Sequence, residues 1–116
     1  MPAGIFNFQI EQGADWPQEM AYIDENDDPV NLTGATLQMQ IRQPLAANTT
    51  LANLTIGNGI TVTNATLGQF SLNLTNAQTS NLPIGAAVYD LEIRYSDGTK
   101  ERLLQGGILV DGEVTR

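Results

Sequence analysis

The chain has 116 residues, with 13 acidic and 5 basic side chains and a formal net charge of −8. This length is typical of one domain, residues 1–116, and so acidic a surface disfavours nucleic acid, whose phosphates it would repel. The sequence holds neither histidine nor cysteine, which removes disulfides, thiolate metal sites and the commonest general base. No apolar run approaches the ~20 residues of a membrane span, and we expect no membrane, metal or cofactor.

The first eight residues, 1–8, are mostly apolar and lack a basic region, so we expect no signal peptide and no Sec export. Phe6, Phe8 and Ile10 alternate with polar residues and predict a first strand over 5–11. Ordered apolar termini are usually tied down, and we interpret 1–8 as an N-terminal segment that anchors the domain to neighbouring chains.

A second strand is predicted over 16–24, with Trp16, Met20 and Tyr22 on one face. Pro17 cannot donate to a strand ladder, so this strand begins near it or lies at a sheet edge there.

A carboxylate-rich turn follows, over 24–28, and contains Asp24, Asp27 and Asp28. It fails the spacing of a calcium-binding EF-hand loop, because Pro29 takes the sixth position and Ala35 the twelfth. We interpret it as a solvated turn, and the sequence leaves open whether it meets a basic partner, a cation or water.

The middle of the chain predicts short strands separated by turns. The clearest alternation, Leu37, Met39 and Ile41, predicts a strand over 35–42. A polar loop over 44–50 and strands over 51–56, 60–63 and 69–74 follow. Thr75 and Gln78 form a capping-box pattern, which predicts one or two helical turns within 75–82 that carry the chain from one sheet to another.

The last segment, 86–110, predicts a hairpin that turns at Asp97-Gly98. Asp90 and Glu92 could be paired catalytic carboxylates, but Arg94 and basic residues of the partner strand favour a solvated charge ladder. Within the last strand, the pair of glycines at 106–107 lacks the lysine and helix of a phosphate loop and indicates a bulge or a close backbone approach. We therefore expect no enzyme.

These elements predict an all-β fold, an antiparallel Ig-like β-sandwich of about seven to nine strands with one short helical turn near 75–82. Tyr89 follows a Leu-Pro-X-Gly crossover. Its hydroxyl either ties back to that crossover, as in a tyrosine corner, or belongs to a plain core tyrosine.

A family resemblance covers roughly residues 15–116. It rests on the order of several ordinary strand and turn motifs. The motifs are an acidic Trp-containing strand, Pro-Val-Asn-Leu-Thr-Gly-Ala-Thr-Leu-Gln-Met-Gln-Ile-Arg, Gly68-Gln-Phe-Ser-Leu-Asn-Leu-Thr, Leu-Pro-Ile-Gly, Tyr89-Asp-Leu-Glu-Ile, Asp97-Gly98 and Arg102-Leu-Leu-Gln-Gly. In this order the chain resembles the small β-sandwich structural proteins of tailed bacteriophages and prophages, and is similar to the N-terminal domain of phage baseplate upper proteins.

The resemblance implies a non-enzymatic virion protein, a multicopy or homo-oligomeric adaptor or anchor of the tail, baseplate or fibre attachment, assembled in the bacterial cytoplasm with other virion proteins. Since the chain stops at Arg116 without a fibre part, a receptor-binding role is not expected. The alternatives are a capsid decoration protein and a carbohydrate-binding module using Trp16, Tyr22 and Tyr95. The predicted interface residues are Ile5, Phe6, Phe8, Trp16, Asp24, Asp27 and Asp28.

Overall fold

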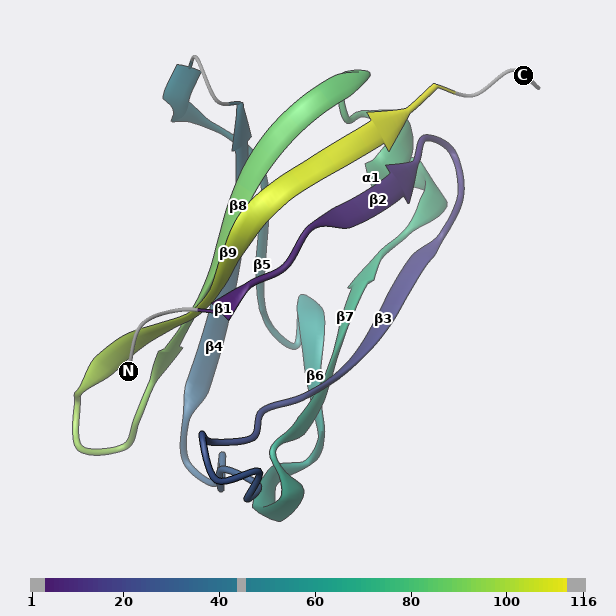
Figure 1. Ribbon diagram of the computed structural model, residues 1–116. Coiled ribbons are helices and arrows are strands. Elements are labelled where there is room, and N and C mark those ends of the chain that lie inside the picture. The colour runs from purple at the N-terminus through teal and green to yellow at the C-terminus, as the bar shows by residue number, and fades with distance from the viewer. Residues whose placement is uncertain (1–3, 44–45, 113–116) are drawn as a thin grey trace.

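Nine strands, one short α-helix and one 3-10 turn make up the part of the chain that the structure describes, residues 4–43 and 46–112 of a computed structural model (Figure 1). The strands are β1 (Gly4–Ile5), β2 (Phe8–Glu11), β3 (Trp16–Ala21), β4 (Thr36–Gln43), β5 (Ala46–Ile56), β6 (Gly59–Asn64), β7 (Gln69–Leu74), β8 (Gly85–Arg94) and β9 (Lys100–Asp111). The helical elements are η1 (Ala65–Leu67) and α1 (Asn76–Ser80). The predicted all-β class is confirmed.

All nine strands belong to one sheet, in the order β1-β9-β8-β4-β5-β6-β7-β3, with β2 also paired to β9. The sheet curls into a half-barrel, so that its two ends turn toward each other (Figure 1). Two separate Ig-like layers are therefore not confirmed, because β4, β5 and β6 join the two walls by continuous strand pairing.

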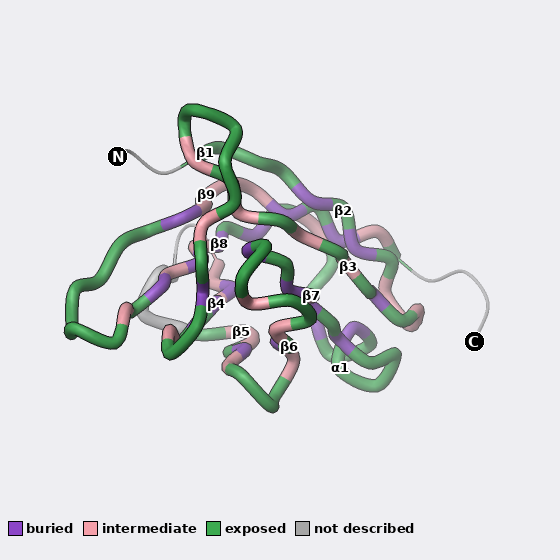
Figure 2. Tube along the Cα trace, turned by 90° about the horizontal axis from the view of Figure 1, so that it is seen from below, coloured by how far each residue is buried: buried purple, intermediate pink, exposed green. Residues whose placement is uncertain are grey.

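The core lies inside the curl, where apolar residues alternate along the strands (Figure 2). Leu37, Met39 and Ile41 of β4 are at most 2% exposed, as their spacing predicts. The same alternation buries the inward residues of β7 and β8, namely Phe70, Leu72, Leu74, Tyr89, Leu91 and Ile93. A contiguous interior of this size is the main source of stability for the fold.

Local sequence signals set the turns and the helix. Thr75 caps α1, and its side chain and that of Gln78 form the predicted capping box. Gly98 adopts a φ of 91° in the β8–β9 turn, where its N–H donates to the Tyr95 carbonyl. A β-carbon would be strained at this φ, so the glycine suits the turn.

The N-terminal strands run parallel to β9, at one end of the sheet. Between β1 and β2 the chain crosses close above Gly106, where a β-carbon would overlap the Phe6 carbonyl oxygen. The predicted close approach at this glycine pair is thus confirmed. The prediction of one continuous strand over 5–11 was wrong, because this crossing interrupts the strand between Ile5 and Phe8 and leaves Phe6 50% exposed while Phe8 is buried.

The predicted loop over 44–50 also needs correction. Residues 46–50 belong to β5, which pairs with β4 through Gln43↔Ala46 and Arg42↔Thr50. The register shifts at Ile41/Arg42 and Arg42/Gln43, and such irregular pairing leaves no clean alternation in the sequence. Pro44 and Leu45 lie outside the described residues, as do residues 1–3 of the predicted anchor.

Candidate functional site: the seam between the sheet edges

Among residues 4–43 and 46–112, no further strand pairs with either end of the curled sheet, so both ends are free strand edges. One edge consists of β1 and β2, and the other is β3. The two edges are consecutive in the chain, since only residues 12–15 separate β2 from β3. We refer to the gap between the two edges as the seam. Unpaired strand edges can accept a further strand, which makes the seam the most prominent candidate for contact with another chain.

The ladder between β3 and β7 shows which backbone groups of β3 are free. Tyr22 N–H donates to the Gly68 carbonyl on the β7 side. In an antiparallel ladder, successive residues point their backbone groups to opposite sides, so Glu19 and Ala21 direct theirs away from β7. Ile23, two residues beyond β3, forms an isolated antiparallel bridge with Pro29. Its neighbour Tyr22 bonds the Gly68 and Val30 backbone, so the Ile23 groups also point to the outer side. Within the described part of the chain no strand pairs with β3 on that side.

Pro17 occupies the same outward register as Glu19. Because proline has no N–H to donate, it is compatible with a position that has no ladder partner. The predicted edge location of Pro17 is therefore confirmed.

A hollow lies across the seam next to Ala21, where β3 ends. It is lined on one side by Ala21, Tyr22 and Ile23, and on the other by Gly4 and a short stretch of β9 that includes Leu103 and Leu104. The side chain of Ile23 is 48% exposed at its rim. The hollow is thus partly apolar and directly beside the outward-facing backbone of β3.

At the end of the seam where the chain passes from β2 to β3, the turn over 12–15 closes the gap and is held against α1. The Thr79 hydroxyl donates to the Ala14 carbonyl at 2.8 Å and accepts the Gly13 N–H at 3.0 Å. Thr79 is fully buried, and Asp15 also accepts the N–H of Asn76 at 2.8 Å. The helix therefore fixes the spacing of the two edges where they meet.

Two tyrosines lie beside the seam at the end opposite the 12–15 turn, where Tyr22 lines the hollow. The side chain of Tyr22, just beyond β3, hydrogen-bonds that of Tyr95, just beyond β8. The Tyr95 hydroxyl donates to Glu101 Oε2 at 3.4 Å. Burial raises the pKa of Tyr95 to about 12, assisted by Tyr22 and Glu101, and burial and Glu101 also raise the pKa of Tyr22.

The apolar residues predicted for the interface divide into two groups. Ile5 and Phe6 are 77% and 50% exposed on the first edge. Phe8 and Trp16 are 6% and 5% exposed and pack together in the core, with their rings edge to face at 5.1 Å. Of the predicted apolar contacts, only Ile5 and Phe6 therefore present surface to a partner.

The acidic loop lies next to the seam. Asp24 Oδ1 accepts the N–H groups of Asn26 and Asp28 at 2.8 and 3.0 Å, as expected of an Asx turn. Asp27 adopts a φ of 62°, and both Asp27 and Asp28 are exposed. The carboxylates are spread by this turn, and the described residues contain no group of acids placed to hold a metal ion.

Tyr89 is buried in the core, and it does not form the tyrosine corner that was one of its two predicted alternatives. The Tyr89 hydroxyl donates to the Phe6 carbonyl at 2.6 Å and not to the crossover that precedes β8. Burial raises the pKa of Tyr89 to about 12. This hydrogen bond ties the first edge to the core from the inside.

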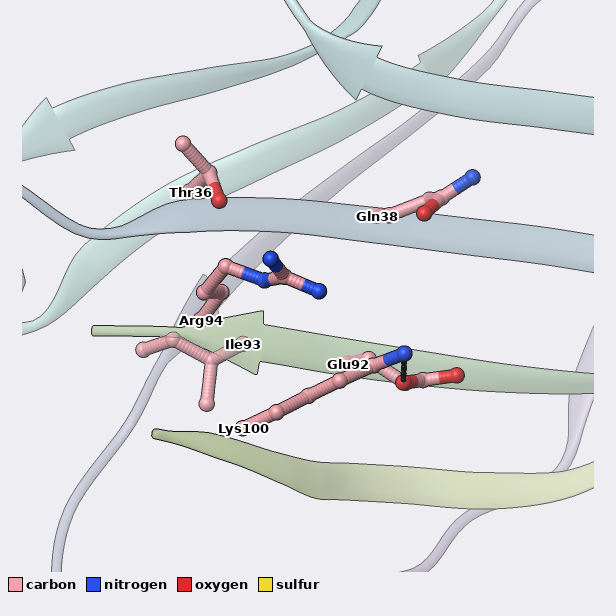
Figure 3. Close-up of a pocket in the computed structure, with 6 residues that line it drawn as sticks. All are labelled: Thr36, Gln38, Glu92, Ile93, Arg94 and Lys100. Carbon is pink, nitrogen blue, oxygen red and sulfur yellow. Dashed lines mark ion pairs between the residues drawn. The ribbon is translucent and has the colours of Figure 1, made fainter. Parts of the chain in front are cut away.

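The carboxylates on the outer face form the predicted charge ladder. Lys100 Nζ lies 2.9 Å from Glu92 Oε2, and Arg102 Nε lies 3.5 Å from Asp90 Oδ2. Figure 3 shows Glu92 and Lys100 at a shallow polar hollow that Thr36, Gln38 and Arg94 also line. Both carboxylates are engaged with cations, as in a solvated strand ladder.

Sequence reasoning missed Thr79 and the outward residues of β3. A buried threonine in a short helix carries no distinctive signal, and edge status depends on pairings distant in the sequence. Pro17 was the one usable indication of an edge.

No known protein family and no curated protein sequence matches the chain. No helix in the described ranges is long and apolar enough to cross a membrane.

Proposed function

We propose that the protein is a non-enzymatic structural subunit of a bacteriophage virion, an adaptor or anchor of the tail, baseplate or fibre attachment. In this proposal the half-barrel acts as an Ig-like sandwich whose two walls pack through the core. The free edges bond to neighbouring subunits.

The observation that supports this proposal best is the pair of free edges on one small domain. Isolated β-proteins usually protect their edges, whereas assembly subunits use them. On the first edge Ile5 and Phe6 are half or more exposed, although large apolar side chains at such positions cost solubility in a free monomer. The family resemblance of the sequence supplies the virion context.

The carbohydrate-binding alternative loses one of its three aromatic side chains. Trp16 lies in the core, where its ring cannot stack on a sugar. Tyr22 and Tyr95 remain partly exposed but are hydrogen-bonded to each other. The platform of exposed rings that sugar stacking requires is therefore reduced to these two residues.

Gold-labelled antibody against the protein, applied to purified phage particles, tests the proposal. Labelling at the tail, baseplate or fibre attachment supports it. Labelling over the capsid shell would indicate the decoration alternative, and particles that contain none of the protein would contradict both.

A variant tests the first edge separately. Ile5→Ser removes an exposed apolar contact without touching the core, and we expect lower occupancy in particles. Leu67→Ser, at a residue 45% exposed in η1, is the matched control and should assemble normally. Equal occupancy of both variants would show that the first edge is not a contact.

A further inference from the structure

The free edge of β3 carries a distinctive combination of backbone, apolar and charged groups. Glu19, Ala21 and Ile23 direct their N–H and carbonyl groups away from β7, at the spacing an added strand requires. Pro17 ends this run at one side because it has no N–H. The available edge therefore extends from Gln18 to Ile23.

The hollow beside this edge can receive the side chains of an added strand. Leu103 and Leu104 form its far wall, and Ile23 forms its rim. An extended segment paired to β3 presents every second side chain to the same face. Apolar residues at alternate positions of the segment would therefore enter the hollow, as in other cases of strand addition.

The charges around the edge select the partner. Seven of the 13 acidic residues fall between Glu11 and Asp28, and the first basic residue of the chain is Arg42. Glu19 is exposed on β3 itself, and the acidic loop follows directly after Ile23. Arg102 lines the hollow, but its charge is matched by Asp90 at 3.5 Å. Complementarity thus favours a basic partner.

The same charges disfavour a second copy of this chain as the occupant. Residues 4–21 supply both edges of the seam and carry Glu11, Asp15 and Glu19 with no basic residue. Pairing these edges between copies would bring carboxylates together, and like charges across a strand pair are destabilising.

We propose that the edge from Gln18 of β3 to Ile23, two residues beyond the strand, accepts as an additional strand an extended segment of another protein in which lysine or arginine alternates with apolar residues. This inference deepens the proposed function by naming the class of partner that the domain joins. The basic side chains lie over Glu19 and the acidic loop, and the apolar ones enter the hollow.

A synthetic peptide of alternating lysine and valine tests the pairing by amide hydrogen exchange. On binding, we expect slower exchange at Glu19, Ala21 and Ile23, while Met20 and Tyr22 are already protected by their bonds on the β7 side. The controls are an alternating glutamate–valine peptide and a lysine–valine peptide N-methylated at every residue, so that neither of its edges can donate. If neither control peptide slows exchange at these amides, the result supports the proposal. Peptide effects confined to the acidic loop, without protection on β3, would overturn it.

Two variants separate backbone pairing from charge. Ala21→Pro removes an outward N–H and leaves the β7 ladder intact, as Pro17 does at the same register, and should weaken peptide binding about tenfold or more. Glu19→Lys should weaken binding to a similar extent. Normal binding by both Ala21→Pro and Glu19→Lys would refute the inference.

Particle incorporation distinguishes this inference from the proposed function. If Ala21→Pro enters particles at wild-type occupancy, the β3 edge is not the contact, while the structural role stands. If the wild-type protein is missing from particles but still binds the peptide through β3, the virion role fails and the basic-strand site stands.

Discussion

The hydroxyl of Tyr89 donates a hydrogen bond to the main-chain carbonyl of Phe6, 83 residues earlier, at 2.6 Å. Tyr89 is 4% exposed and stands on β8, while Phe6 lies at the crossing between β1 and β2. The bond thus connects the first free edge to the centre of the sheet. It holds in place the segment that we propose meets neighbouring subunits.

Replacing Tyr89 with phenylalanine should loosen the first edge. The variant keeps the ring contacts and loses only the hydroxyl, so we expect a loss of about 1–2 kcal/mol in the free energy of unfolding, because a partly buried carbonyl is left without this donor. Urea unfolding measures the loss, and hydrogen exchange should show faster exchange at Phe8. An unchanged midpoint would mean that the bond contributes nothing to stability.

The tyrosines predict a loss of stability in alkaline solution. The folded-state pKa of Tyr89 and of Tyr95 is about 12, whereas the ordinary value is 10.0. Above pH 10 the unfolded chain loses phenolic protons that the folded chain retains, so stability is full below pH 10 and falls as the pH rises toward 12. Urea midpoints measured from pH 9 to pH 11.5 should decline, and Tyr89→Phe should show a smaller decline. Parallel curves would contradict the assignment to Tyr89.

The glycine pair in β9 offers a matched comparison. A β-carbon at Gly106 would overlap the Phe6 carbonyl oxygen, whereas one at Gly107 would have its nearest neighbour at 3.7 Å. Gly106→Ala should therefore displace the first edge and cost about 1–3 kcal/mol, and Gly107→Ala should cost less than about 1 kcal/mol. Thermal unfolding of the two variants side by side provides the measurement. Equal effects would be inconsistent with the close approach.

Thr79 should control the spacing of the two edges. Thr79→Val preserves the side-chain shape but removes the partners of the Ala14 carbonyl and the Gly13 N–H, with an expected cost of about 1–3 kcal/mol. Ser80→Ala removes an exposed hydrogen bond to Asn76 in the same helix and should cost less than about 0.5 kcal/mol. Chemical denaturation compares the two, and the account fails here if Ser80→Ala is the more harmful change.

Local patterns in the sequence were sufficient for much of the fold. Alternation in β4 and β8 identified Leu37 and Leu91 as core residues, and the Thr75–Gln78 pair identified the helix start. These features depend on neighbouring residues. The pairing of residues 4–11 with residues 104–111 does not, and nothing in either segment alone specifies a parallel partner about a hundred residues away.

The candidate site was harder to predict for the same reason. Phe6 and Phe8 occupy equivalent places in the alternation, yet Phe6 is half exposed and Phe8 is buried, because the chain crosses Gly106 between β1 and β2. Trp16 looked available for an interface, and the curl of the sheet instead places it against Phe8. Edges and curvature arise only when all the strands are paired.

The most direct test of the central claim is a density map of the assembled particle at a resolution that traces strands. The account predicts this half-barrel at regular, symmetry-related positions in the tail or baseplate, with a basic segment of another protein paired to β3. A map in which the domain occupies those positions with both sheet edges facing solvent would contradict the claim that its edges join the assembly.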